Sequence, residues 1–389
     1  MPYLDNASTT PVSPEAADAA SHILRQVWGN PSALYRAGME AEAAIEEARS
    51  ILAKALGCTP KEVFFTGSGT EANNIAIFGA ARVRASWGNE LVTTGYEHPS
   101  VSGPLEMLAA REGFTLHQVA PGADGKVDIS ELVSKVGPKT ALVSAMQVNN
   151  ETGATLDVAT LAATVKAKNP RCFVHVDGIQ GFCKLGVKPS DTKIDSYSLS
   201  GHKLHAPKGV GALYLRAGGN FVPLMAGGGQ EADSQNRCVR PGTENTAHIA
   251  ALGRAVKLAS AQREATVSKV TLLKAALLKG LEEIPGCRVH SPQDAYPGTV
   301  FFSLPAGYRS EMMIHHLDEG FDVQVSSGSA CHGGQPSHTL CAMGVPGDQI
   351  DTALRVSFSG WNTPEDVDTL LRGLKEGFAA RAHGRPGKR

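Results

Sequence analysis

The chain has 389 residues, of which 42% are hydrophobic, and its 37 lysines and arginines nearly balance 38 acidic residues to give a formal net charge of -1. Such a chain can bury a large core, and its balanced charge gives no bias toward nucleic acid. No stretch approaches a membrane span, and the amino terminus lacks the basic and apolar regions of a secretory signal, so we expect the cytoplasm. Seven cysteines without a C-x-x-C pair fit a reducing compartment better than a disulfide framework or a zinc-binding metal site.

Helix-like and strand-like segments alternate along the chain. Helices are expected at about 13–27, at 41–56 with Gly57 as the stop, and at 71–84, and strands are expected at 63–65, 90–94, 140–145, 172–176 and 195–200. This order predicts an α/β fold with a doubly wound, mostly parallel sheet. After Thr243 a long helical stretch to Glu283, broken near Ala265, leads to a smaller region with a strand at 299–304 and a final helix at 365–378.

The segment from Thr66 to Asn74 follows the first of these strands and opens a helix. Its glycines let the backbone approach an anion, and the free N–H groups of the new helix point at it, so we expect a phosphate cradle. Alone it is a weak signal. It matches neither the dinucleotide fingerprint nor the P-loop, which argues against a nucleotide-dependent oxidoreductase.

The apolar run at 172–176 ends at Asp177, as in buried parallel strands whose carboxyl ends carry a site. A buried carboxylate is costly unless it meets a cation, and the pyridinium nitrogen of pyridoxal 5'-phosphate (PLP) is such a partner. A helix N-cap is the alternative interpretation of Asp177 taken alone.

Lys203 follows the strand at 195–200 within a segment of hydroxyl, imidazole and glycine groups. A lysine held at the end of a strand is a candidate for the covalent attachment of a carbonyl cofactor. The alternative for an isolated lysine is an ordinary solvated loop residue.

Cys331 lies in a stretch of small polar residues with His332 beside it. An exposed thiol next to an imidazole ionises readily, and the thiolate is the nucleophilic form. The remaining cysteines mostly lie in apolar surroundings, where we expect inert thiols: Cys58, Cys172, Cys183, Cys238, Cys287 and Cys341.

Together these segments resemble the cysteine desulfurases of the NifS/IscS type, a branch of the class V aminotransferase group of PLP enzymes, over essentially the whole chain. The motifs that carry the resemblance are 3–11 (YLDNASTTP), 29–32 (GNPS), 69–71 (GTE), 97–98 (EH), 148–151 (VNNE), Asp177 with Gln180, 200–203 (SGHK), 240–245 (RPGTEN), 328–331 (GSAC), 336–338 (PSH) and 354–357 (LRVS). The resemblance implies the PLP-dependent transferase fold type I. It also implies a large PLP-binding domain at 13–255 and a smaller α+β domain, built from 1–12 and 256–389, that carries the cysteine loop.

The resemblance also implies a role for each matching residue. Lys203 would bind PLP covalently, His98 would stack on its ring, Asp177 would pair with its nitrogen and Gln180 would meet its phenolic oxygen. The expected phosphate ligands are Gly69, Thr70, Ser200, His202 and, from the second subunit of a homodimer, Thr243. Asn150, also expected beside the cofactor, and Arg355 would orient the substrate carboxylate, for which an arginine fork is suited.

The reaction implied is the conversion of L-cysteine to L-alanine. The Lys203 amine, together with His98, would remove the Cα proton. The Cys331 thiolate would attack the substrate sulfur to form a persulfide. The sulfur would then pass to an acceptor such as an iron–sulfur scaffold protein, with loop movement provided by the glycines at 328, 333 and 334.

The sequence departs from the family pattern at three places: Leu34-Tyr35 replaces a histidine, Ala206 replaces a glycine, and the segment after Cys331 is about two residues shorter. The local sequence around Cys331 is also similar to selenocysteine lyases, so selenocysteine is an alternative substrate. A class V aminotransferase or lyase without sulfur transfer is a further alternative, but it would not need a loop cysteine. A non-enzymatic binding protein would need neither Lys203 nor Asp177. The basic tail at 379–389 is expected to be frayed.

Overall fold

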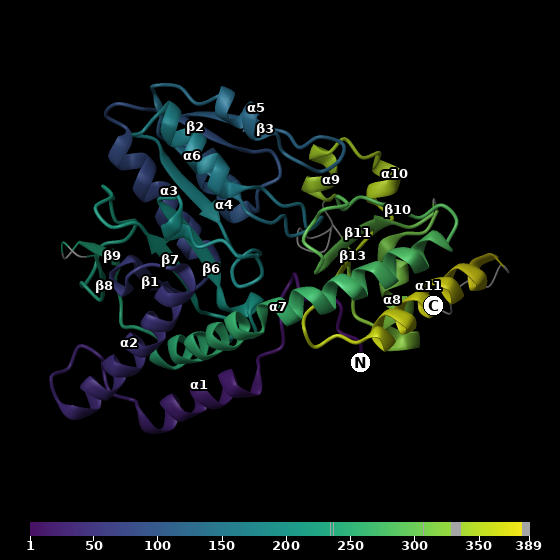
Figure 1. Cartoon of the computed structure of the whole chain (residues 1–389), viewed down its shortest axis with the longest axis horizontal. Helices are drawn as coiled ribbons and strands as arrows, with labels where there is room; N and C mark the ends of the chain where they lie inside the picture. Colours follow the sequence, from purple (N-terminus) through teal and green to yellow (C-terminus); the bar gives the residue numbers. More distant parts are fainter. Residues whose placement is uncertain (234, 236, 306, 328–335, 383–389) are drawn as a thin grey trace.

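The computed structural model describes residues 1–382 except 234, 236, 306 and 328–335. Two sheets organise the chain, and one long helix connects them (Figure 1). We call the part built on the seven-stranded sheet the large-sheet region, and the part built on the four-stranded sheet the small-sheet region. No helix among the described residues is long and apolar enough to cross a membrane.

The seven strands of the large sheet lie in the order β1 (Val63–Thr66), β7 (Gly211–Leu215), β6 (Ser196–Ser200), β5 (Phe173–Asp177), β4 (Thr140–Met146), β2 (Glu90–Thr94) and β3 (Thr115–Val119). The five strands from β2 to β6 are parallel neighbours, whereas β7 pairs antiparallel with both β6 and β1. The predicted doubly wound, mostly parallel sheet is therefore confirmed. Strand β7 was not predicted. It returns so close to its neighbours that a Cβ on Gly211 would lie 2.7 Å from the Leu199 carbonyl oxygen.

Helices cover both faces of the large sheet, which is why its strands are apolar without alternation. One face packs against α3 (Gly69–Arg84) and α4 (Pro99–Arg111). The other packs against α2 (Arg36–Leu56), α5 (Ile129–Ser134), α6 (Val158–Lys168) and the first half of α7 (Thr246–Glu282), with α1 (Pro14–Gln26) lying along α7. Smaller elements are η1 (Pro60–Glu62), η2 (Pro189–Asp191), η3 (Gly201–Lys203) and the ribbon of β8 (Glu231–Ala232) and β9 (Cys238–Arg240).

The small-sheet region contains the antiparallel strands β10 (Arg288–Val289), β11 (Thr299–Ser303), β13 (Ala353–Ser357) and β12 (Ser326–Ser327) in that order. Its main core lies between this sheet and α8 (Ser310–Phe321), α11 (Pro364–Ala382) and the second half of α7. Residues of α9 (His338–Ala342) pack against Phe301 and Ala353, and α10 (Gly347–Ile350) follows. The amino-terminal segment joins this region, because Tyr3 and Asp5 form β-bridges with Gln324 and Ser357.

Helix α7 runs without interruption for 37 residues, so the predicted break near Ala265 is wrong. Ile249 and Val256 lie in the core of the large-sheet region, and Val270 and Leu277 lie in the core of the small-sheet region. Packing at both ends stabilises this helix. The residues in its middle oppose a helix only through weak intrinsic propensity, which packing overrides. The predicted division at residue 255 falls inside this helix and stays a prediction.

Candidate active site

The sequence-predicted site residues gather at the carboxyl ends of strands that run in the same direction. Asp177 is the last residue of β5, Ser200 is the last residue of β6, and His98 follows β2 and caps α4. Gly69 opens α3 just after β1. This edge of an α/β sheet is where such folds bind their ligands.

The predicted phosphate cradle forms the start of α3. Ser68 caps this helix with its hydroxyl oxygen, and Gly69 and Thr70 are the first helical residues, whose N–H groups have no acceptor within the helix. A Cβ on Gly69 would lie 2.3 Å from Ile179 Cδ1 and 3.1 Å from Ser200 Cβ, so only glycine lets these segments meet. The helix N-terminus, the glycine and the Ser200 side chain form a site that suits a phosphate.

Glu71 links this cradle to the segment that carries Thr243. Its carboxylate accepts a hydrogen bond from the Gly67 N–H (2.6 Å) and forms an ion pair with Arg240 Nε (3.0 Å). Thr243 itself is exposed. Its predicted contact with the cofactor of a second subunit stays a prediction.

Asp177 is buried, with 4% of its surface exposed. Its oxygens accept hydrogen bonds from two neutral donors, the Asn73 amide (2.9 Å) and the Ile179 N–H (2.9 Å). Burial raises the pKa of Asp177 more than the nearby charges of His98 and Lys203 lower it. A bound cation such as a pyridinium would offset that cost of burial.

Asn73 belongs to a buried network behind Asp177 that the sequence analysis missed. Burial lowers the pKa of His175 to about 3, so its ring is neutral. His175 Nε2 lies 3.0 Å from the Asn73 amide oxygen, and His175 Nδ1 lies 2.8 Å from the Ser196 hydroxyl. The Asn73 oxygen can only accept, so His175 Nε2 donates and the Asn73 NH₂ faces Asp177 and Ser100. The available signal was a histidine two residues before Asp177, on the same face of an apolar strand.

The ring of His98 is exposed, and its Nδ1 bonds to Ser100. Nδ1 accepts a hydrogen bond from the Ser100 N–H (3.1 Å) and lies 2.8 Å from the Ser100 hydroxyl. A neutral His98 therefore carries its proton on Nε2. That nitrogen is placed to donate a proton rather than to take one up.

Lys203 ends the η3 turn directly after β6, as predicted for a residue at a strand end. Its ammonium donates to the carbonyl oxygens of Ala7 (2.5 Å) and Ser8 (2.6 Å). Gln180 Nε2 donates to the same Ala7 oxygen (2.8 Å). The amino-terminal segment thus brings Lys203 and Gln180 to one acceptor.

His202 is half-buried, and its Nδ1 lies 3.1 Å from the Thr9 hydroxyl. Burial, followed by the charges of Lys203 and Lys208, lowers the pKa of His202 to about 4. His202 is therefore neutral near pH 7. It can offer a phosphate a hydrogen bond but no charge.

The structure brings Arg355 and Asn150 together, because Arg355 Nη1 donates to the Asn150 carbonyl oxygen (3.0 Å). The guanidinium is buried, and Nη2 also bonds to Asp5 Oδ1 (2.8 Å) and the Ser8 hydroxyl (2.5 Å). Arg355 Nε is buried with no hydrogen-bond partner among the described residues. The sequence analysis did not foresee that Asp5 occupies part of the arginine fork. A substrate carboxylate would have to share the fork with Asp5 or displace it.

Cys331 and the glycines at 328, 333 and 334 lie outside the described residues. The described residues that flank this segment lie beside the residues predicted to bind the substrate. Ser326 pairs with Arg355 in the small sheet, and the Ser337 hydroxyl donates to the buried carboxylate of Glu151, which follows Asn150.

Five other cysteines are poor nucleophiles at neutral pH because burial raises their pKa. The pKa rises to about 12 for Cys58 and Cys172 and to about 11 for Cys183 and Cys287, and it also rises for Cys238. Cys341 is exposed on α9. The expectation of apolar surroundings is therefore wrong for Cys341.

PLP fits these residues in three respects. A helix N-terminus with a glycine that admits no side chain suits its phosphate, a buried carboxylate with neutral donors suits its ring nitrogen, and a lysine lies at the adjacent strand end. The exposed His98 ring is available to stack on a flat heterocycle.

Known proteins share this architecture over nearly the whole chain. Residues 2–370 match the aminotransferase class-V family model. The chain is 39% identical to a cysteine desulfurase from Cereibacter sphaeroides, covering 96% of this chain and 94% of the relative. It is 35% identical to the cysteine desulfurase IscS from Dictyoglomus turgidum, covering 95% and 92%. A solved NifS-like protein superposes with a TM-score of 0.90 at 33% identity and covers 97% of this chain and 99% of that one.

Proposed function

Because the chain belongs to the class V aminotransferase family and, within it, to the cysteine desulfurases, we propose that its site binds PLP and L-cysteine and passes the sulfur to Cys331. The enzyme is PLP-dependent. The observation that carries the residue assignment is the meeting of Asp177, Lys203 and the α3 N-terminus at one sheet edge. The single contribution of the bound cofactor is an electron sink for the carbanion that forms at the substrate Cα.

Two residues move protons in this proposal. Lys203 holds the cofactor until the amino group of cysteine takes its place, and its freed amine then takes the Cα proton. The carbonyls of Ala7 and Ser8 keep that amine beside the site. His98 assists as a donor from Nε2, because Ser100 occupies its other nitrogen. This division of roles sharpens the joint assignment of proton removal to Lys203 and His98.

Cys331 receives the sulfur. Its thiolate attacks the substrate sulfur, an S–S bond forms as the carbon–sulfur bond breaks, and the carbon skeleton takes up protons and leaves as alanine. Arg355 and Asn150 orient the substrate carboxylate close to the two ends of the cysteine segment. A protein acceptor of the iron–sulfur scaffold type would then remove the sulfur, as part of the same proposal.

We also propose a homodimer in which Thr243 of each chain reaches the phosphate bound by its partner. The ion pair between Arg240 and Glu71 supports this arrangement, because it fixes the Thr243 segment beside a cradle while Thr243 stays exposed. Mixing inactive Lys203→Ala chains with inactive Thr243→Ala chains should restore part of the activity, because one site of the mixed dimer then carries neither defect. A monomer that is fully active at sedimentation equilibrium would refute the shared site.

The central experiment measures alanine and alkylation-trapped persulfide from L-cysteine. Wild type should give both, and Cys331→Ala should keep its PLP absorbance but lose both, because cysteine's sulfur is a poor leaving group without a nucleophile. Cys341→Ala is the matched control, since Cys341 is the exposed cysteine among the described residues. Normal turnover by Cys331→Ala, with Cys341→Ala inactive, would overturn the assignment of the nucleophile.

Selenocysteine is the second candidate substrate, and its turnover distinguishes a selenocysteine lyase from a cysteine desulfurase. Selenium leaves with less help, so a selenocysteine lyase should keep part of its activity on selenocysteine in Cys331→Ala. A wild-type enzyme with a much larger kcat/KM for selenocysteine than for cysteine would favour that candidate, which the shortened segment after Cys331 motivates.

A further inference from the structure

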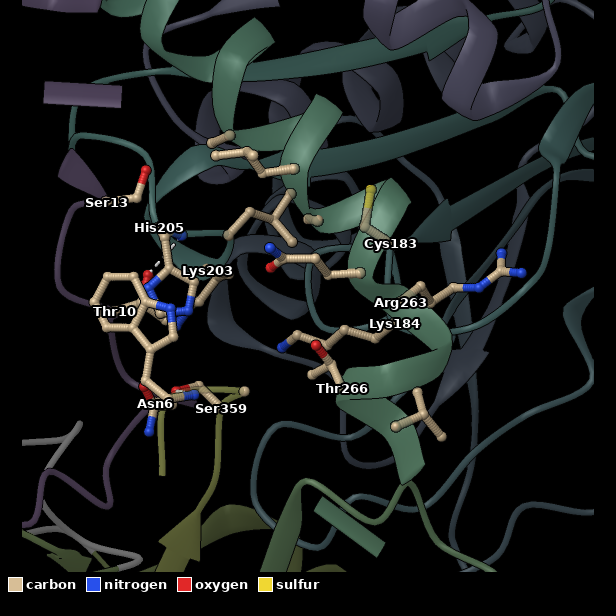
Figure 2. A pocket seen from close by; sticks show the side chains of 18 of the residues that line it. Asn6, Thr10, Ser13, Cys183, Lys184, Lys203, His205, Arg263, Thr266 and Ser359 are labelled. Atoms are coloured by element: carbon tan, nitrogen blue, oxygen red, sulfur yellow. Dashed lines mark hydrogen bonds between the residues drawn. The ribbon is translucent and has the colours of Figure 1, made fainter. Parts of the chain in front are cut away.

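A cavity lies beside Lys203, between α7 and the amino-terminal segment. It has a volume of about 500 Å³, and Lys184, Lys203 and His205 line it (Figure 2). Tyr296, Phe358 and Trp361 also belong to its lining. Asp177, His98 and Arg355 do not line it. The cavity therefore shares Lys203 with the expected cofactor site but none of these three residues, and its size suits a metabolite-sized molecule.

Lys184 extends its ammonium group into this cavity (Figure 2). Its Nζ donates to Gln180 Oε1 (3.0 Å) and lies 5.7 Å from the centre of the Tyr296 ring. No described acidic residue forms an ion pair with Lys184. Burial lowers its pKa to about 8, so most molecules still carry the charge near pH 7. A cation withdrawn from water beside neutral partners is costly, and a bound anion would offset that cost.

The surrounding side chains define the kind of anion. The Arg263 guanidinium points away from the cavity, and Lys269 is bonded to the Gly360 carbonyl oxygen (2.8 Å). Glu15 is the acidic residue in the described lining. The remaining lining is more apolar than polar, with Leu258 and Ala259 as apolar examples and Gln262 and Thr266 as polar ones. Lys203 also lines the cavity, but its ammonium donates to the carbonyl oxygens of Ala7 and Ser8. Lys184 is then the ammonium best placed to meet a ligand, and one such charge suits a monovalent organic anion better than a multiply charged phosphate.

We propose that this cavity binds a small organic carboxylate, whose anionic end pairs with Lys184 and whose apolar body lies against α7, and that binding changes how Gln180 is held. The connection is a short chain of hydrogen bonds. Gln180 accepts from Lys184 through its oxygen and donates to the Ala7 carbonyl through its nitrogen, and that carbonyl also accepts from Lys203. A carboxylate at Lys184 competes with the Gln180 oxygen, so the site next to the cofactor senses the cavity.

The test uses phenylacetate as the probe and the PLP-loaded enzyme, with binding measured by isothermal titration calorimetry. Phenylacetate should bind wild type, and 2-phenylethanol, which has a similar size but no charge, should bind much more weakly. Lys184→Met should weaken phenylacetate binding at least about tenfold, as expected for the loss of a charge-assisted hydrogen bond. Lys139→Met, at an exposed lysine far along the chain, is the matched control.

A second variant keeps the result interpretable if Lys184→Met folds poorly. Ala259→Phe fills the cavity but leaves Lys184 in place, and it should also abolish binding. Phenylacetate should shift the pH titration of the cofactor absorbance in wild type but not in Lys184→Met. The proposal is overturned if phenylacetate does not bind, if binding survives both variants, or if Arg355→Ala alone removes it, since the anion would then occupy the substrate position. None of these outcomes depends on turnover of cysteine.

Discussion

The two walls of the candidate site are built in different ways. The cofactor wall, made of His98, Asn73, His175, Asp177 and Lys203, comes from strand ends and helix starts of one sheet, and a network of neutral side chains holds its buried carboxylate, Asp177. The substrate wall, made of Asp5, Asn150, Glu151 and Arg355, joins segments from opposite ends of the chain through charged groups.

The difference follows from what each wall holds. A permanently bound group needs fixed donors and a low local dielectric, which the buried network of neutral side chains around Asp177 provides. A substrate that enters and leaves needs a charged partner whose hydrogen bonds can be exchanged. Arg355 is that partner, and it already bonds to another carboxylate, that of Asp5. The following variants test this contrast.

The largest effect is expected at the cofactor wall from Lys203→Ala. Removing the only amine assigned to both covalent binding and proton removal should lower turnover at least about 10³-fold. Borohydride treatment should trap no PLP on this variant. Lys208→Ala, an exposed lysine of the same segment, is the control and should behave as wild type. A reducible cofactor link in Lys203→Ala would contradict the assignment.

At the substrate wall, Arg355→Lys should act mainly on substrate binding. The charge stays but the planar fork is lost, so KM for cysteine should rise roughly tenfold to a hundredfold, while the absorbance of bound PLP stays unchanged. Arg82→Lys alters a comparable arginine fork to Glu112 far from the site and should leave KM unchanged. A roughly tenfold to hundredfold fall in kcat with no change in KM would show that Arg355 does not bind the ground-state carboxylate.

Asn73→Ala tests the neutral network. It removes the partner of His175 Nε2 and one donor to Asp177, and leaving such buried groups unsatisfied should destabilise the protein by about 1–3 kcal/mol. The affinity for PLP should fall as well, because Asp177 is less well positioned. Asn74→Ala, at the adjacent and less buried residue, should cost far less in denaturant unfolding. Equal losses in both variants would argue against a special role of the network.

The last test concerns pH and the buried Glu97 behind the same wall. Burial, with Asp177 as a second cause, raises the pKa of Glu97 from 4.5 to about 8 despite hydrogen bonds from Thr94 and Met146. The folded state thus binds a proton that the unfolded state releases. Stability should therefore fall as pH rises from about 4.5 to about 8, by at most about 1.4 kcal/mol per pH unit.

Glu97→Gln resembles the protonated acid and should flatten that part of the pH profile. Unfolding of the two PLP-loaded proteins between pH 5 and pH 9 checks this expectation. Parallel profiles over that range would mean that Glu97 titrates near its ordinary value.

The sequence predicted the cofactor wall better than the substrate wall, and the reason is physical. Asp177 and Lys203 each follow a strand with a clear apolar pattern, so local periodicity places them at the sheet edge. The contact between Asp5 and Arg355 joins residues 350 positions apart, and no local pattern records such a pairing.

The missed features show the same limit. Asn73 lies within the quoted cradle segment, but its partner His175 is 102 residues away. Strand β7 and the unbroken α7 depend on neighbours that packing supplies rather than on their own propensity. The individual roles of the site residues stay proposals for the experiments above.

The unbroken α7 also sets the angle between the large-sheet region and the small-sheet region. At 1.5 Å and 100° per residue, its 37 residues form a rod about 55 Å long that fixes the rotation of one core about the other. Inserting a single residue in its exposed middle, at 257–269, would turn the small-sheet region by about 100° and carry Arg355 away from Asn150. Surface loops of this chain can change in length, but we expect the residue count of this segment to be fixed by catalysis itself.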